Sequence, residues 1–129
     1  MELIEIGLLA VGAVAGAVLR YKLVESSVTI GGLPVNVLIV NILGSFILGL
    51  FSILALGFNL DAKYSLLVAV GFCGSFTTMS SFALETSNLL DSNRFNLVAL
   101  NIIANVGLSL GAVIGGREVG NVVLERVMR

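Results

Sequence analysis

Charged residues are absent from three long stretches of the chain, and a fourth stretch, at its start, holds only one. No Asp, Glu, Lys or Arg occurs between Ser26 and Leu60, between Tyr64 and Leu84, or between Phe95 and Gly116. Only Glu5 interrupts the span from Leu3 to Leu19. Because a helix needs about 20 mostly apolar residues to cross the hydrocarbon core, this pattern predicts four membrane-spanning helices.

The short polar segments between these stretches set the helix limits. We place the helices at about residues 3–20, 35–56, 64–90 and 95–115, followed by a short charged tail. The acidic start of the chain is unlike the positively charged start of a secretory signal peptide, so we expect the first helix to be retained. The sequence therefore predicts an all-α integral membrane protein with a single membrane domain over residues 1–129.

The third helix contains the unusual stretch GFCGSFTTMSSFALE at residues 71–85, which combines glycines, hydroxyl residues and aromatic rings. Gly71 and Gly74 flank Cys73, and the hydroxyls that follow compete for backbone hydrogen bonds. We expect the helix to break near its centre. Non-helical backbone at this depth is tolerated only where it is buried in protein or lines a cavity. The alternative is a kink without function, and composition alone does not decide between the two.

Composition excludes several classes of function. The chain is 57% hydrophobic and only 12% charged, whereas roughly a quarter of the residues in soluble domains are charged. It has no histidine and no paired carboxylates, so we expect no enzyme activity. A net charge of -1 offers no basic surface for nucleic acid.

Small residues recur at four-residue spacing on three of the predicted helices. This spacing places them on one helix face, where backbones can approach closely within a membrane. Two interpretations remain open, namely packing within the chain and contact between subunits. The stripes are Gly12 and Gly16, Ser45 and Gly49, and Gly107, Gly111 and Gly115.

Lys and Arg residues are almost evenly divided between the two sides of the membrane. Four of the seven lie on the side of the termini, and three lie on the other. Orientation normally follows a Lys/Arg excess on the cytoplasmic side. The balance therefore indicates either weak orientation or insertion in both directions. The second interpretation predicts an antiparallel homodimer, with a site at its seam built twice.

Polar side chains at membrane depth form further stripes, with Asn41 and Ser45 on the second helix and Asn101, Asn105 and Ser109 on the fourth. Such residues either form interhelical hydrogen bonds, worth about 0.6 kcal/mol each, or line a polar path. The side chains are neutral donors, and a cation path would be expected to carry carboxylates. The path therefore favours a small anion.

The residues from Gly71 to Glu85 resemble the third helix of the Fluc fluoride channels, whose pattern is close to G-F-x-G-G-x-T-T-F-S-T-F-S-x-E. The sequence from Gly16 to Tyr21 is similar to that family's G-x-x-x-R-[WY], and the segment beginning at Val40-Asn41 is similar to its V-N-x-x-G. The resemblance implies an antiparallel homodimer in the cell membrane, with two pores that export fluoride passively. It also implies a structural sodium ion at the dimer centre.

The resemblance also implies roles for individual residues. Backbone carbonyls of Gly74 and Thr77 would hold the sodium ion, while Arg20 and Glu85 would have vestibule or structural roles. Met79 stands where most members carry the first of two phenylalanines, and methionine lacks a ring edge. The implied fluoride pore comprises Asn41, Met79, Ser80, Ser81, Phe82 and Ser109.

Two other classes of protein share parts of this pattern. Small multidrug transporters also have four helices, but they carry a glutamate within the first helix, and Glu5 lies too near its start. A non-transporting membrane assembly subunit would use the polar residues only for packing. A fluoride flux assay distinguishes both from a channel.

Overall fold

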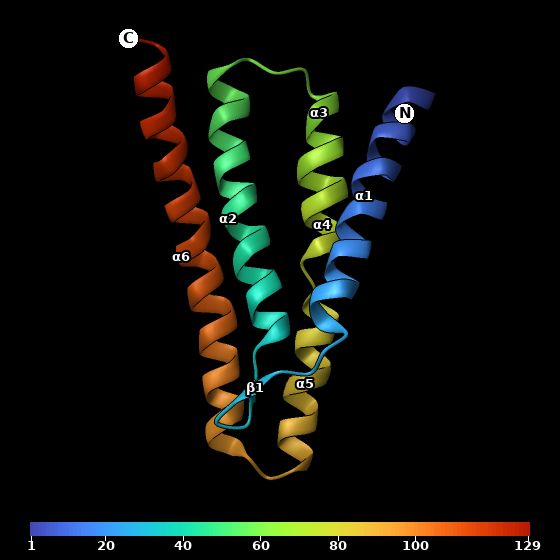
Figure 1. Cartoon of the computed structure of the whole chain (residues 1–129), viewed down its shortest axis with the longest axis vertical. Coiled ribbons are helices and arrows are strands. Elements are labelled where there is room, and N and C mark those ends of the chain that lie inside the picture. Colours follow the sequence, from blue (N-terminus) through green and yellow to red (C-terminus); the bar gives the residue numbers. More distant parts are fainter.

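Four long helical segments run side by side, and each is long and apolar enough to cross a membrane (Figure 1). The computed structural model describes residues 1–129, with both termini at the same end of the bundle (Figure 1). The four segments are α1 (Leu3–Val24), α2 (Asn36–Gly57), a composite third segment (Lys63–Asp91) and α6 (Phe95–Val127). The predicted all-α, four-helix membrane fold is confirmed.

The third segment contains four shorter elements. They are α3 (Lys63–Ser65), the π-helix η1 (Leu66–Cys73), α4 (Gly74–Phe76) and α5 (Met79–Asp91). Between α4 and α5 the backbone is extended at Thr77 (φ -80°, ψ 156°) and at Thr78 (φ -150°, ψ 119°). We call these two residues the Thr77–Thr78 step.

The glycines that we expected to interrupt this segment do not themselves leave helical geometry. Gly71 lies inside η1, and Gly74 has helical angles (φ -63°, ψ -29°). Gly71 instead allows a close helix contact, because a Cβ there would lie 2.8 Å from the carbonyl oxygen of Leu9 in α1. The non-helical residues are two threonines, whose short polar side chains form local hydrogen bonds that compete with the helix.

Glycines bring the helices together in two pairs, with α1 against η1 and α4, and α2 against α6. A Cβ at Gly12 or Gly16 of α1 would collide with a backbone carbonyl of the third segment, and one at Gly116 of α6 would collide with the carbonyl of Phe46. Most of this packing therefore depends on the absence of a side chain.

The three predicted stripes of small residues have different roles in the chain. Gly12 and Gly16 pack within it, as does Gly49 of α2 against Val113. Nothing within the chain lies within 4 Å of a Cβ built at Gly107, Gly111 or Gly115. The α6 glycines that do pack against α2 are Gly116 and Gly120, which lie outside the predicted stripe.

Two helices continue beyond the limits that we placed from the charges. Helix α6 runs to Val127 rather than 115, and α1 runs to Val24 rather than 20. Charges mark the edge of the hydrocarbon core, whereas Arg, Glu and Leu favour helix on either side of it. The 33 residues of α6 span about 50 Å at 1.5 Å per residue, against a core of about 30 Å.

A short hairpin covers the end of the bundle where α5 meets α6 (Figure 1). Strands β1 (Thr29–Ile30) and β2 (Leu33–Pro34) pair antiparallel around a turn in which both glycines have positive φ, +59° and +86°. Leu33 is buried against Leu89 of α5 and Leu97 of α6. The hairpin thus links the α1–α2 connection to the far end of the third segment.

Candidate functional site

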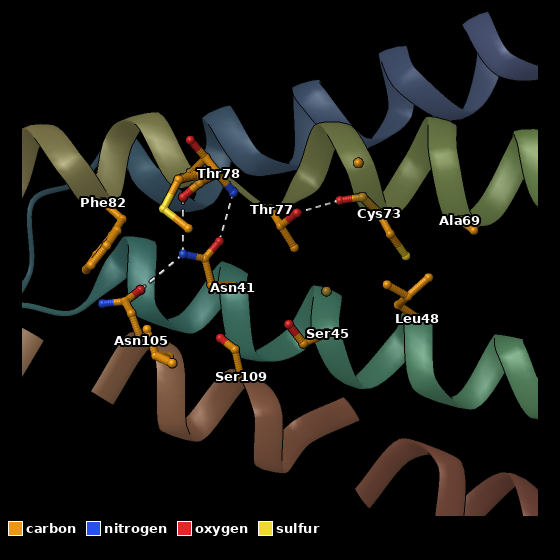
Figure 2. A pocket seen from close by; sticks show the side chains of 14 residues that line it. Asn41, Ser45, Leu48, Ala69, Cys73, Thr77, Thr78, Phe82, Asn105 and Ser109 are labelled. Carbon is orange, nitrogen blue, oxygen red and sulfur yellow. Dashed lines mark hydrogen bonds between the residues drawn. The ribbon is translucent and has the colours of Figure 1, made fainter. Parts of the chain in front are cut away.

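A groove of about 420 Å³ lies between α2, the third segment and α6 (Figure 2). Its lining carries hydroxyl, amide and apolar side chains, and it contains no charged residue. Most of the residues predicted for the pore and for the sodium site meet here, namely Asn41, Gly74, Thr77, Met79, Phe82 and Ser109.

The carboxamide of Asn41 points from α2 toward the Thr77–Thr78 step (Figure 2). Asn41 Oδ1 accepts the Thr78 N–H at 2.8 Å, and Asn41 Nδ2 donates to Thr78 O at 3.2 Å. Asn41 Nδ2 also donates to Asn105 Oδ1 at 3.0 Å. Both amide hydrogens of Asn41 therefore have protein acceptors. An anion that accepted a hydrogen bond from Asn41 would have to replace either Thr78 O or Asn105 Oδ1 as the acceptor.

Asn105 belongs to a second set of amide contacts along α6. Its Nδ2 donates to both O and Oδ1 of Asn101, each at 3.0 Å. Asn101 Nδ2 then donates to Thr86 Oγ1 of α5 at 3.1 Å, and Thr86 Oγ1 donates to Phe82 O at 2.8 Å. Asn101 is 0% exposed and Asn105 is 5% exposed. This buried chain of amides joins α2, α5 and α6.

Three other side chains in the groove differ in how freely they can meet a ligand. Ser109 Oγ is buried and has no hydrogen-bond partner within the chain, so its O–H is available as a donor. Met79 is 71% exposed and stands at the open side. Phe82 is half-buried and borders the same space (Figure 2).

The carbonyls of Gly74 and Thr77 lack the donors that a continuous helix would give them. The N–H of Thr78, four residues after Gly74, donates to Asn41 Oδ1. The N–H of Ser81, four residues after Thr77, donates to Thr78 Oγ1 at 3.1 Å. Unwound backbone carbonyls of this kind can coordinate a sodium ion.

A second pocket, of about 340 Å³, lies between the end of α1 and the start of α5. Its lining includes Arg20, Tyr21 and Glu25 from α1 and its C-terminal end, together with Ser81 of α5. Arg20 forms no ion pair within 4.0 Å, whereas Glu25 is paired with Lys22 at 3.8 Å. The predicted residues Arg20 and Ser81 therefore lie together, outside the groove.

Comparison with known proteins decides the family of this chain. Residues 7–117 match the family described as "CrcB-like protein, Camphor Resistance (CrcB)". The chain belongs to the CrcB family. Its relatives include proteins named "Fluoride-specific ion channel FluC", and the resemblance to fluoride channels is confirmed at the level of the family.

Several relatives of this CrcB chain match over nearly their whole length. The protein of Nitrosopumilus maritimus is 55% identical over 96% of this chain and 98% of its own length. The protein of Methanococcus maripaludis is 42% identical over 88% of this chain and 93% of its own. That of Methanopyrus kandleri is 40% identical over 92% and 91%. All three carry the name of an ion channel, not of an enzyme.

Two residues predicted for the site of this CrcB chain border neither pocket. Ser80 is exposed, and its Oγ lies 3.2 Å from Thr78 Oγ1. Glu85 is half-buried in α5, and its Oε2 has no hydrogen-bond partner. Their predicted roles stay predictions.

Sequence reasoning left two important residues out of the site, Thr78 and Asn105. Thr78 is the N-cap of α5, where Thr is a favoured residue, so a search for caps within the hydroxyl stretch could have found it. Asn105 was noted only as part of a polar stripe. Its contact with Asn41 joins residues 64 positions apart, and no local pattern indicates such a pair.

Proposed function

We propose that this chain forms a fluoride channel in the cell membrane, which lets the anion leave the cytoplasm passively. One observation supports this most strongly, namely a groove at membrane depth with neutral donors and no charged residue. Ser109 offers an unpaired hydroxyl, and the ring edge of Phe82 carries the positive part of its quadrupole. The names of the relatives supply the identity of the anion.

We further propose that two copies assemble as an antiparallel homodimer with one pore for each groove. The groove is open along one side, where Met79 is 71% exposed. Amide and hydroxyl groups facing lipid are costly, so a second copy that covers this side stabilises it. The even division of Lys and Arg between the two sides of the membrane supports an inverted partner.

We propose that the backbone carbonyls of Gly74 and Thr77 hold a sodium ion. Both residues border the groove, and neither carbonyl receives its helical hydrogen bond. Hard cations prefer oxygen ligands, and a second copy would supply the same two carbonyls again. Once bound, the ion would contribute structural charge at the seam, while this chain would contribute the backbone geometry that holds it.

The direct test of function is fluoride efflux from proteoliposomes, followed with a fluoride electrode and repeated with chloride. We expect fluoride efflux from the native protein, slow chloride efflux, and a loss of fluoride efflux in Phe82→Ile. The matched control is Phe95→Ile, because Phe95 is 63% exposed at the start of α6 and lies outside the groove. No fluoride efflux from the native protein would instead favour a non-transporting assembly subunit.

A further inference from the structure

The side chain of Asn41 forms hydrogen bonds with both the N–H and the carbonyl of Thr78, as the backbone of a neighbouring β-strand would. The carboxamide of Asn41 accepts from the Thr78 N–H at 2.8 Å and donates to its carbonyl at 3.2 Å (Figure 2). Thr78 is 6% exposed, so water does not compete for these groups. Backbone groups outside a helix need such partners at membrane depth. A carboxamide carries a donor NH₂ group and an acceptor oxygen side by side, so one side chain can pair with both backbone groups.

Asn41 could present its amide in either of two orientations, and Asn105 and the backbone of Thr78 both favour the same one. Asn105 Oδ1 accepts from Asn41 Nδ2 at 3.0 Å. A rotated Asn41 amide would place two oxygens against each other there, and would place its NH₂ group against the Thr78 N–H. Only the observed orientation satisfies both neighbours.

The orientation of Asn105 is fixed in turn by backbone. Its Nδ2 donates to the carbonyl oxygen of Asn101 at 3.0 Å, and a backbone carbonyl can only accept. From Asn101 the chain of hydrogen bonds continues through Thr86 to Phe82 O. It therefore starts at the N-cap of α5 and returns to the same helix one turn later.

We propose that Asn105 is a positioning residue that acts through Asn41 to hold the Thr77–Thr78 step in its extended form. Helix α6 thereby supports the geometry of the Thr77–Thr78 step through the side chain of Asn41 in α2. This inference deepens the proposed pore and rests on the proposed function for any consequence for flux. The positioning itself concerns only this chain's own hydrogen bonds.

Amide hydrogen exchange at Thr78, measured by NMR on the purified full chain in micelles, tests the inference. In Asn105→Leu we expect the Thr78 amide to exchange about fivefold faster or more, as loss of one hydrogen bond implies. The matched control Asn121→Leu makes the same change at an exposed position on α6 and should leave Thr78 unchanged. Native exchange at Thr78 in Asn105→Leu would overturn the proposal.

Exchange at the amides of α1 distinguishes a local effect on Thr78 from a general loss of stability. Amides along α1 should keep their native exchange rates, because a general loss of stability would accelerate exchange there too. Equal acceleration along α1 and at Thr78 would overturn the positioning role.

If Asn105→Leu does not fold, Asn105→Ser serves in its place, since the short side chain of serine cannot reach Asn41. Fluoride efflux is measured separately. A native protein without efflux would remove the proposed function, while Thr78 exchange would still decide the role of Asn105.

Discussion

The third segment is held on its two sides by different kinds of contact. On one side, α1 packs against η1 through Gly12 and Gly16, where a single added methyl group would collide with backbone carbonyls. On the other side, α2 and α6 reach the Thr77–Thr78 step through the amides of Asn41 and Asn105. The first contact fixes position by close backbone approach, whereas the second fixes backbone conformation by hydrogen bonding. The third segment therefore combines one closely packed face with another face that is held by polar side chains.

The largest effect on stability should follow from Asn41→Asp, which changes the contact between α2 and the Thr77–Thr78 step. The carboxylate would lose both donated hydrogen bonds and would face the oxygens of Thr78 and Asn105. Leaving partly buried polar groups without partners costs about 1–3 kcal/mol, and more where one of the groups is charged. We expect loss of fluoride efflux and a matching fall in the free energy of unfolding in detergent. Native stability in this variant would contradict a stabilising role for the hydrogen bonds between Asn41 and the backbone of Thr78.

Removal of sodium should have the next largest effect, because the proposed ion ties the same step to a second copy. A ligand present at 100 times its Kd stabilises the folded state by about 2.7 kcal/mol. Replacing sodium with a large organic cation should therefore lower the melting temperature and the efflux rate together. Potassium chloride at equal ionic strength is the control for general salt effects. An unchanged melting curve would leave Gly74 and Thr77 without an ion.

Gly16→Ala tests only the close contact between α1 and the third segment. Its Cβ would collide with the carbonyl of Phe72, and overpacking of this kind costs about 1–3 kcal/mol. The matched control is Gly107→Ala, whose Cβ meets nothing within 4 Å. We expect a lower melting temperature for the first variant and an equal or higher one for the second, since Ala favours helix over Gly by up to about 1 kcal/mol.

The smallest effect on stability should come from Ser109→Ala. The hydroxyl of Ser109 has no partner in the chain, so its removal should leave the melting temperature unchanged. Fluoride efflux should nevertheless fall about tenfold or more, because a hydrogen bond to a charged group is worth roughly 1.5–3 kcal/mol. Efflux at the native rate would show that this hydroxyl does not meet the ion.

The sequence predicted those features that depend on local composition. The gaps between charged residues gave the four membrane spans, because the hydrocarbon core excludes charge wherever it is crossed. The hydroxyl stretch identified the irregular part of the third segment. Several residues of the groove were named in advance, Asn41, Phe82 and Ser109 among them.

Features that depend on distant contacts were beyond the reach of the sequence. The extended backbone at Thr78 is satisfied by Asn41, 37 positions earlier in the chain, so the nearby glycines indicated the wrong residues. The repeating glycines of α6 posed a similar problem. Gly107, Gly111 and Gly115 share the spacing of Gly12 and Gly16, yet only the latter two pack within the chain. Spacing gives the face of a helix but not what lies against it.

The central claim, that fluoride passes through the groove, is tested most directly by blocking it. Fluoride efflux from proteoliposomes should be compared between Ser109→Leu, which fills the groove from α6, and Asn121→Leu, which adds the same side chain at an exposed position on α6 outside the groove. We predict that Ser109→Leu abolishes efflux and that Asn121→Leu conducts at the native rate. Native efflux from correctly assembled Ser109→Leu would contradict the account and place the ion path elsewhere.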